Sequence, residues 1–297
     1  MAQTQTRPWP VPPTGGLVIH HVSDTHFGYR SWSHAEGDHM LRDLSEGLIP
    51  PVDVLVHTGD IVDGPNLAAE DAYAKKWLTA AGKNVPSVWA VGNHDLRDRA
   101  PTTRAAWESA YGRPGNTYVD VDGHRIVTFT VDSHTLNADW IVPEATWTWL
   151  DKVASDAPGP VILAEHFPPW ELGVDLTLGA LQPPARFAEF VSAHPNVVGM
   201  LAGHMHWDPG DQRSAVMLNI GNRTAFPVLT DVSAMLTIST LTRDQSAQLP
   251  SVSAYVRILP DLWEVRYRHH GPHAWLGPGG MRVTRLHLDT GVEERCM

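Results

Sequence analysis

Five short polar motifs combine residue types that bind metal ions. They are Asp24-Thr25-His26, Gly59-Asp60, Gly92-Asn93-His94-Asp95, His166 within Glu165-His166-Phe167-Pro168-Pro169, and Gly203-His204-Met205-His206. Taken singly, four of them have ordinary explanations such as a solvated turn. The Gly-His-x-His motif has more weight by itself, because its two imidazoles are so close. Most of the motifs follow a short hydrophobic run, which is where open α/β sheets place their sites. Their order along the chain therefore indicates one shared site.

The residue types suit two divalent cations. A pair of cations about 3.5–4 Å apart can hold both oxygens of an in-line displacement at phosphorus. Such a pair needs a bridging carboxylate to offset its repulsion, with neutral imidazoles and hard oxygen donors on each side. The glycines before Asp60, Asn93 and His204 permit tight turns, or φ values that a side chain disfavours. The motifs therefore predict phosphate chemistry at a metal centre.

Strands that alternate with helices are expected to position these motifs. Short apolar runs predict strands over residues 17–23, 52–58, 85–91, 125–131, 161–164 and 197–202. Apolar residues at helical spacing predict helices over 70–81, 144–154 and 184–193. This alternation favours an α/β core with largely parallel sheets.

Beyond His206 the pattern changes to strands alone. We expect them over residues 217–220, 234–239, 253–259, 263–267 and 282–288, with a hairpin turn at Pro260-Asp261. No internal repeat and no convincing linker divides the chain. We expect a flexible arm over residues 1–16, then one domain over 17–297, with a core at 17–222 and a C-terminal β extension at 223–297.

In this order, the five motifs resemble those of the calcineurin-like metallophosphoesterases, and most of all the class III cyclic-nucleotide phosphodiesterases. The resemblance covers roughly residues 17–222. It implies a four-layer α/β/β/α sandwich, here with additional C-terminal strands. It also implies two metal ions, with manganese or iron expected first and zinc or cobalt also suited to the donors. By similarity, the seven ligands are Asp24, His26 and His206 on the first metal, Asn93, His166 and His204 on the second, and Asp60 between them.

The resemblance also assigns the catalytic residues. His94 matches the family's catalytic histidine, which faces the phosphate, and Asp95 is expected to orient it, while a metal-bound hydroxide is the family's nucleophile. The third motif ends in Asp95, where protein Ser/Thr phosphatases have Glu, and no arginine soon follows Asp60. Purple acid phosphatases need a tyrosine three residues after the bridging Asp, where this chain has Asp63. The sequence therefore disfavours assignment of this chain to the protein Ser/Thr phosphatases or to the purple acid phosphatases.

Composition and charge indicate which classes of partner and which location to expect. The 297 residues carry a formal charge of −11, without a long basic run, which argues against a stable nucleic-acid complex. No apolar run reaches the roughly 18 residues that span a bilayer. The proline-rich start has no secretory signal character, and the single cysteine is Cys296, so we expect a cytoplasmic protein. The expected partner is a small-molecule phosphodiester, and a homodimer is compatible with the sequence.

Several other residues have two interpretations. Asp63 is either a carboxylate that steadies a ligand or part of a surface turn. His34, His39 and His134 are either solvated or near the substrate pocket. Trp32, Trp170 and Trp207 follow metal motifs and could stack on a nucleobase. Structural roles are expected for His20, His21, His57, Trp147 and Trp149, and surface positions for His269, His270 and His273, which have no matching acidic partner nearby in the sequence.

The leading hypothesis is therefore hydrolysis of nucleoside cyclic monophosphates, with a slight preference for 2′,3′-cyclic substrates because their five-membered ring is strained. A phosphomonoesterase or a nuclease is the alternative, although nuclease relatives usually carry extra domains for which this chain has little room. A non-catalytic binding scaffold is the remote alternative, and it is disfavoured because all seven ligand positions are filled.

Overall fold

The structure is a computed structural model. It describes residues 16–29, 33–63, 67–96, 104–131, 140–169, 181–182, 184–206, 215–220, 223–230, 252–276 and 283–296. The predicted strand at 234–239, together with Trp32, His134, Trp170 and Trp207, lies outside these ranges.

Two large β-sheets form the centre of the molecule. The strands of the first sheet are β16 (Val292–Cys296), β15 (Val283–His287), β13 (Leu262–His269), β12 (Val252–Leu259), β1 (Leu17–Val22), β2 (Val54–His57) and β3 (Ser87–Trp89) in that order, with β14 (Ala274–Trp275) beside β13. The second sheet has the order β10 (Ala215–Ile220), β11 (Arg223–Thr230), β9 (Val197–Ala202), β7 (Val161–Ala164), β5 (His124–Thr128) and β4 (Thr117–Val121). A separate pair joins β6 (Trp140–Ile141) to β8 (Leu181–Gln182).

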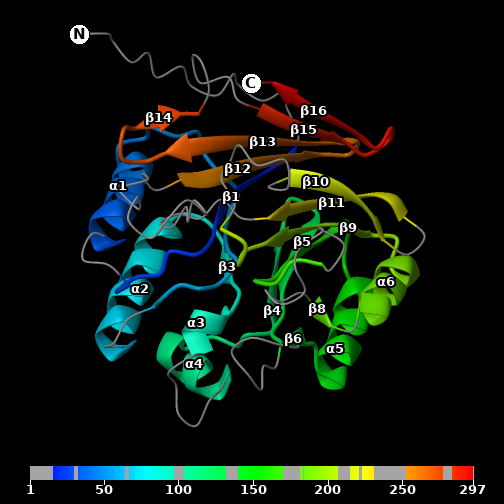
Figure 1. The fold of residues 1–297 in the computed structure, drawn as a ribbon, viewed down its shortest axis with the longest axis horizontal. Coiled ribbons are helices and arrows are strands. Elements are labelled where there is room, and N and C mark those ends of the chain that lie inside the picture. The colour runs from blue at the N-terminus through cyan, green and yellow to red at the C-terminus, as the bar shows by residue number, and fades with distance from the viewer. Residues whose placement is uncertain are drawn as a thin grey trace, which may run out of the picture.

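Helices cover the outer face of each sheet. On one side lie α1 (Ser33–Ser45) and α2 (Leu67–Ala81), and on the other lie α5 (Glu144–Ser155) and α6 (Pro184–Ala193) (Figure 1). The short helices α3 (Asn93–Leu96) and α4 (Arg104–Tyr111) follow β3. The expected four-layer sandwich with extra C-terminal strands is confirmed.

Three large apolar clusters join the layers. Leu17 and Ile19 of β1 pack with Ile162 of β7 between the two sheets. Val22, on the opposite face of the same strand, packs with Trp77 of α2 instead, as the two-residue period of a strand requires. Trp147 of α5 fills the third cluster beside the second sheet, which confirms its predicted place in the core. These clusters fix the strand ends that carry the motifs.

The C-terminal extension contributes strands to both sheets. Strand β12 pairs antiparallel with β1, and β13 follows it through the predicted Pro260-Asp261 hairpin. Strand β11 runs parallel to β9 in the second sheet. Residues after 222 therefore complete both sheets.

The expected surface position is wrong for His270. It is fully buried, and its Nδ1 atom lies 2.8 Å from a carboxylate oxygen of Asp43 in α1. Arg268 and His273 contact the same carboxylate at 2.8 and 2.6 Å. The acidic partner that seemed to be missing is 227 residues away in the chain, and this Asp43 cluster fastens α1 to the C-terminal strands.

Candidate metal centre

Parallel strands deliver the motifs to one edge of the sandwich. Strands β1, β2 and β3 are neighbours, and so are β7 and β9. Each of these five strands ends two to four residues before its motif ligand, which is Asp24, Asp60, Asn93, His166 or His204. Because the carboxyl ends of parallel strands meet at the same edge, the five loops converge there.

The loops hold one another through backbone hydrogen bonds. The Asp24 and His26 amides donate to the carbonyls of Gly59 and Asp60, each at 3.0 Å. The Gly203 amide donates to the His166 carbonyl at 2.8 Å in the other half of the site. The two halves are joined where the His204 amide donates to Oδ2 of Asp24 at 3.1 Å. The side chains therefore rest on a rigid frame.

Strained backbone marks the predicted ligands themselves. Of the seven non-glycine residues with positive φ in the described part of the chain, five are predicted ligands: Asp24, His26, Asp60, His204 and His206. Positive φ is uncommon outside glycine and persists where the surrounding structure imposes it, often at functional sites. From the sequence, tight turns or such angles are expected at the glycines before Asp60, Asn93 and His204.

The glycines serve mainly to allow close approach. Gly59 does adopt positive φ, at 90°. A Cβ atom on Gly92 would lie 2.1 Å from Oδ1 of Asp60, and one on Gly203 would lie 2.2 Å from Oγ of Ser23. A side chain at either position would push the neighbouring loop, and with it a predicted ligand, out of place.

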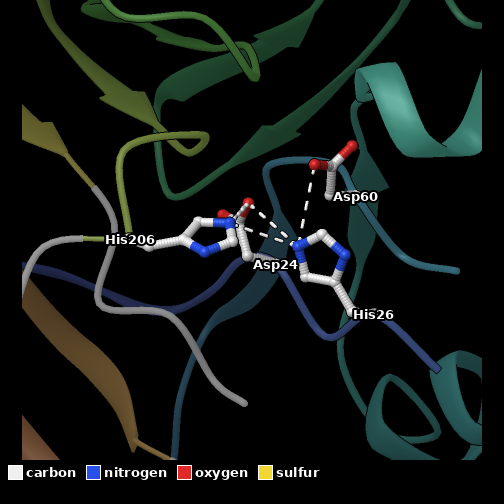
Figure 2. A group of neighbouring side chains, drawn as sticks. All are labelled: Asp24, His26, Asp60 and His206. Carbon is white, nitrogen blue, oxygen red and sulfur yellow. Dashed lines mark hydrogen bonds and ion pairs between the residues drawn. The ribbon is translucent and has the colours of Figure 1, made fainter. Parts of the chain in front are cut away.

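The first group of candidate ligands is Asp24, His26, Asp60 and His206 (Figure 2). Nε2 of His206 lies 2.8 Å from Oδ1 of Asp24 and 3.2 Å from Nε2 of His26. Nε2 of His26 lies 3.7 Å from oxygens of both Asp24 and Asp60. Two imidazole nitrogens and two carboxylates thus point at one small volume.

The second group contains Asp60, His166 and His204, with Asn93 beside them. Oδ1 of Asn93 lies 3.0 Å from Nε2 of His166 and 3.1 Å from Nδ1 of His204. Nε2 of His166 lies 3.3 Å from Oδ2 of Asp60. Nδ1 of His166 donates to the Thr58 carbonyl at 2.8 Å, so in the neutral ring Nε2 keeps its lone pair for a cation.

Buried negative charge makes this site suited to cations. Burial alone would raise the pKa of Asp24, but His206 and His26 hold that pKa well below its usual range. Burial alone would lower the pKa of His26, but Asp24, Asp63 and Asp60 raise it to about 10. Asp60 acts in the same way on His166, raising its pKa to about 9 against the effect of burial. The buried carboxylates remain ionised and attract positive charge.

The donors fit two divalent cations. Imidazole nitrogens and carboxylate or amide oxygens are suitable ligands for Mn, Fe, Zn and Co. Nitrogens that face one another at 3.2 Å, in His26–His206 and again in His166–His204, are the arrangement expected around ions. Asp60 belongs to both groups, as a bridging ligand would.

His94 lies beside the two groups and is more exposed than His26. Its side chain is 24% exposed, compared with 2% for His26, and the two rings meet edge to face at 4.8 Å. Its backbone amide donates to Oδ1 of Asp60 at 2.8 Å. Its position allows it to face a bound substrate.

The carboxylate nearest the His94 ring nitrogens is that of Asp63. Oδ2 of Asp63 lies 2.9 Å from Nδ1 of His94 and 3.4 Å from Nδ1 of His26. The interpretation of Asp63 as a carboxylate that steadies other residues is therefore favoured over a surface turn. The sequence leaves both roles open for Asp63, whereas the resemblance implies that Asp95 orients His94.

Asp95 organises the backbone. It is fully buried and accepts hydrogen bonds from the amides of Ile61 and Val62 through Oδ1, at 2.9 and 3.1 Å. Its Oδ2 accepts the Gly92 amide at 2.9 Å. Asp95 thus ties the loop after Asp60 to the loop that carries Asn93 and His94.

Within the described ranges, the remaining histidines that the sequence singled out are buried or paired with neighbouring side chains. His20, His21 and His57 are buried, as expected. His34 pairs with Glu70 at 2.7 Å and stacks on Tyr73. His39 lies 3.5 Å from Glu36. Tyr29, which sequence reasoning did not consider, lies with its ring 6.4 Å from that of His26.

Comparisons with known proteins agree with this geometry. The sequence profile described as "Calcineurin-like phosphoesterase" matches residues 17–208. A probable cyclic nucleotide phosphodiesterase of Rhodococcus erythropolis is 28% identical over 69% of this chain and 70% of its own length. A cAMP/cGMP dual specificity phosphodiesterase of Mycobacterium tuberculosis is 29% identical over 72% of this chain and 69% of its own length.

Solved structures share the fold at low identity. A purple acid phosphatase from yellow lupin has a TM-score of 0.58 at 10% identity, covering 89% of this chain and 53% of that one. The anchor protein GAP50 of Plasmodium has a TM-score of 0.51 at 12% identity, covering 92% of this chain and 89% of that one. An enzyme and an anchor thus share one architecture, so the fold alone does not decide the activity.

No helix in the described ranges is long and apolar enough to cross a membrane.

The profile covers well over half of the chain, and all five motifs lie within it. The fold and the clustered acidic and imidazole side chains agree with that match. This chain belongs to the calcineurin-like phosphoesterase family, and it is accordingly an enzyme that hydrolyses phosphoric esters.

Proposed function

We propose that this enzyme uses two metal ions to hydrolyse the phosphodiester of nucleoside cyclic monophosphates. Asp24, His26 and His206 hold the first ion, and Asn93, His166 and His204 hold the second. Asp60 bridges them. The single observation that carries this proposal is the place of Asp60, whose Oδ2 atom lies 3.7 Å from Nε2 of His26 and 3.3 Å from Nε2 of His166.

Two cations held by these residues would polarise the phosphate and lower the pKa of a bound water. The protein's own residues then position and assist. His94 stands at the exposed side of the centre, where its ring nitrogen Nε2, 3.9 Å from Asp60, is available to the leaving oxygen. Oδ2 of Asp63, 2.9 Å from Nδ1 of His94, holds the ring in this orientation. His94 is therefore assigned to proton donation or to stabilising charge on the leaving group.

The substrate class rests on two supports. Both relatives described above are named as cyclic nucleotide phosphodiesterases, and each aligns over about 70% of its length. The formal charge of −11, without a basic run, provides little attraction for a long polyanion. A small diester therefore suits this chain better than DNA or RNA.

The test is a substrate panel with Mn²⁺-loaded protein and a chelated control. It compares kcat/KM on 2′,3′- and 3′,5′-cyclic nucleotides, an aryl diester, an aryl monoester and single-stranded nucleic acid. We expect metal-dependent hydrolysis of the cyclic nucleotides, and ring strain favours the 2′,3′ isomer. Efficient cutting of nucleic acid with both cyclic isomers untouched would replace this proposal with the nuclease alternative. No hydrolysis of any ester by protein with two bound metals would leave the scaffold alternative.

A further inference from the structure

Tyr29 is an exposed aromatic residue next to the candidate metal centre. The residue is 45% exposed, a value that among the described Phe, Tyr and Trp residues only Tyr118 equals. Its ring centre lies 6.4 Å from that of His26, and the two planes are inclined by 60°. Large aromatic side chains are usually buried or at an interface, so this position is informative.

The rings around His26 show where the open side of the centre lies. His26 is 2% exposed and has ring contacts with His94 at 4.8 Å and His206 at 5.0 Å. Those two neighbours are 24% and 14% exposed, so the centre opens to solvent beside them. Tyr29 is the next aromatic neighbour of His26 and is more exposed than either.

The turn that carries Tyr29 is held in place. The Tyr29 amide donates to the carbonyl of His26, which is a predicted ligand, at 3.1 Å. Gly28 between them has φ of 91°, and a Cβ atom there would lie 2.5 Å from Cγ of Glu70 in α2. The turn therefore packs closely on α2, and the backbone that carries Tyr29 is pre-organised relative to His26. Pre-organisation lowers the entropy that binding would otherwise cost.

We propose that Tyr29 is the stacking platform for the base of the bound nucleotide. This inference rests on the proposed function and adds a determinant of substrate binding to it. With the phosphate at the metals, the rest of the substrate extends toward the open side of the centre, where the Tyr29 ring lies. Every nucleobase has a π-face, so stacking on a phenol ring tolerates any base and favours purines, which offer the larger surface.

The experiment compares wild type with Tyr29→Ala and Tyr29→Phe, all loaded with Mn²⁺. Tyr118→Ala is the matched control, because Tyr118 is equally exposed but lies on β4, under Arg125. Each variant is assayed on a cyclic nucleotide and on the corresponding ribose cyclic phosphate without a base. Calorimetry compares the binding of a nucleoside monophosphate with that of ribose phosphate, and elemental analysis gives the metal content.

Removal of the Tyr29 ring should weaken binding of the base. The Tyr29→Ala loss in kcat/KM on the nucleotide should exceed its loss on the baseless phosphate by about 5- to 150-fold, mostly through KM, with the larger values for purines. The same difference should appear in the calorimetric Kd values. Tyr29→Phe should restore most of it, and Tyr118→Ala should match wild type.

Three results would overturn the inference while leaving the proposed function intact. They are equal losses on the nucleotide and the baseless phosphate, a Tyr29→Phe variant as poor as Tyr29→Ala, and loss of metal from Tyr29→Ala. The second would assign a role to the hydroxyl, and the third a role in bracing His26. If wild type hydrolyses neither cyclic isomer, the proposed function itself fails, and this inference fails with it.

Discussion

Nδ1 of His94 lies 2.9 Å from Oδ2 of Asp63, and the same oxygen lies 3.4 Å from Nδ1 of His26. One carboxylate therefore contacts both the candidate catalytic histidine and a candidate metal ligand. Burial alone would raise the pKa of Asp63, but the two imidazoles keep that pKa below its usual range, so the carboxylate is ionised near neutral pH. It can fix the tautomer and orientation of both rings.

This contact predicts a catalytic role for Asp63 that acts through His94. Asp63→Asn keeps the size of the side chain and removes its charge, so we expect kcat to fall by about 10- to 100-fold. In a His94→Ala background the same substitution should cost much less, because the ring that it positions is gone. Steady-state kinetics of the four-member mutant cycle measure this coupling. Fully additive losses would assign Asp63 to His26 and the metals instead.

The bridging role of Asp60 predicts the loss of both metals together. Asp60→Asn keeps an oxygen that can accept the His94 amide but removes the charge shared by the two groups. We expect elemental analysis to show reduced occupancy at both sites, with hydrolysis abolished. Asp156→Asn, at an exposed aspartate of the α5 C-terminus, is the control and should keep both metals. Two metals retained at wild-type affinity in Asp60→Asn would contradict the bridge.

His94 should affect rate and not metal content. General acid assistance is typically worth about 10²- to 10⁴-fold, so His94→Ala should keep its metals and lose rate on that scale. A p-nitrophenolate leaving group needs little protonation, so the loss should be smaller for it than for an alkoxide. Equal losses for the two leaving groups would remove the acid role and favour charge stabilisation.

The strand ends could be predicted because local sequence specifies them, whereas the candidate ligands were assigned through the resemblance of the five motifs to a known family. The run VILA at Val161–Ala164 is apolar at every position and forms a fully buried strand with the predicted bounds. By contrast, α1 was missed, because His34, Glu36, Asp38 and His39 interrupt its apolar pattern. Its place is stabilised partly by tertiary contacts that no local pattern contains.

Side-chain contacts between residues far apart in the sequence could not be predicted. Asp43 and His270 are 227 residues apart, so nothing near either residue indicates the other. The roles of Asp63 and Asp95 could not be separated for a related reason. Both are aspartates within three residues of a predicted ligand, and only the folded backbone shows that Asp95 accepts main-chain amides while Asp63 contacts His94.

The Asp43 cluster predicts a large effect on stability. Asp43 and Arg268 are fully buried and joined at 2.8 and 3.1 Å. Removal of one partner of a buried ion pair typically costs about 3–5 kcal/mol, because the other charge stays buried without compensation. Asp43→Asn should therefore lower the free energy of unfolding by roughly that amount in urea titrations. Asp156→Asn removes an exposed ion pair with Lys152 and should leave stability unchanged. Similar stability of the two variants would mean that the cluster contributes little.

The buried His21 predicts a loss of stability in mild acid. Its Nε2 lies 2.9 Å from Oγ1 of Thr58, and burial lowers its pKa to about 3. The unfolded chain titrates near the ordinary value of about 6.5, so between these values the unfolded state binds more protons. The contribution of His21 is fully present above about pH 6.5 and falls by about 1.4 kcal/mol per pH unit as the pH drops toward 3.

His21→Gln removes this titration while its amide can still reach Thr58. Urea unfolding of wild type and variant, both with metals chelated, should be followed from pH 7.5 to 4.5. Other groups titrate in both proteins, so the difference between the two curves isolates His21. We expect that difference to be constant above pH 6.5 and to shift against wild type by roughly 2–3 kcal/mol at pH 4.5. Parallel curves over the whole range would show that His21 is protonated equally in the folded and unfolded states.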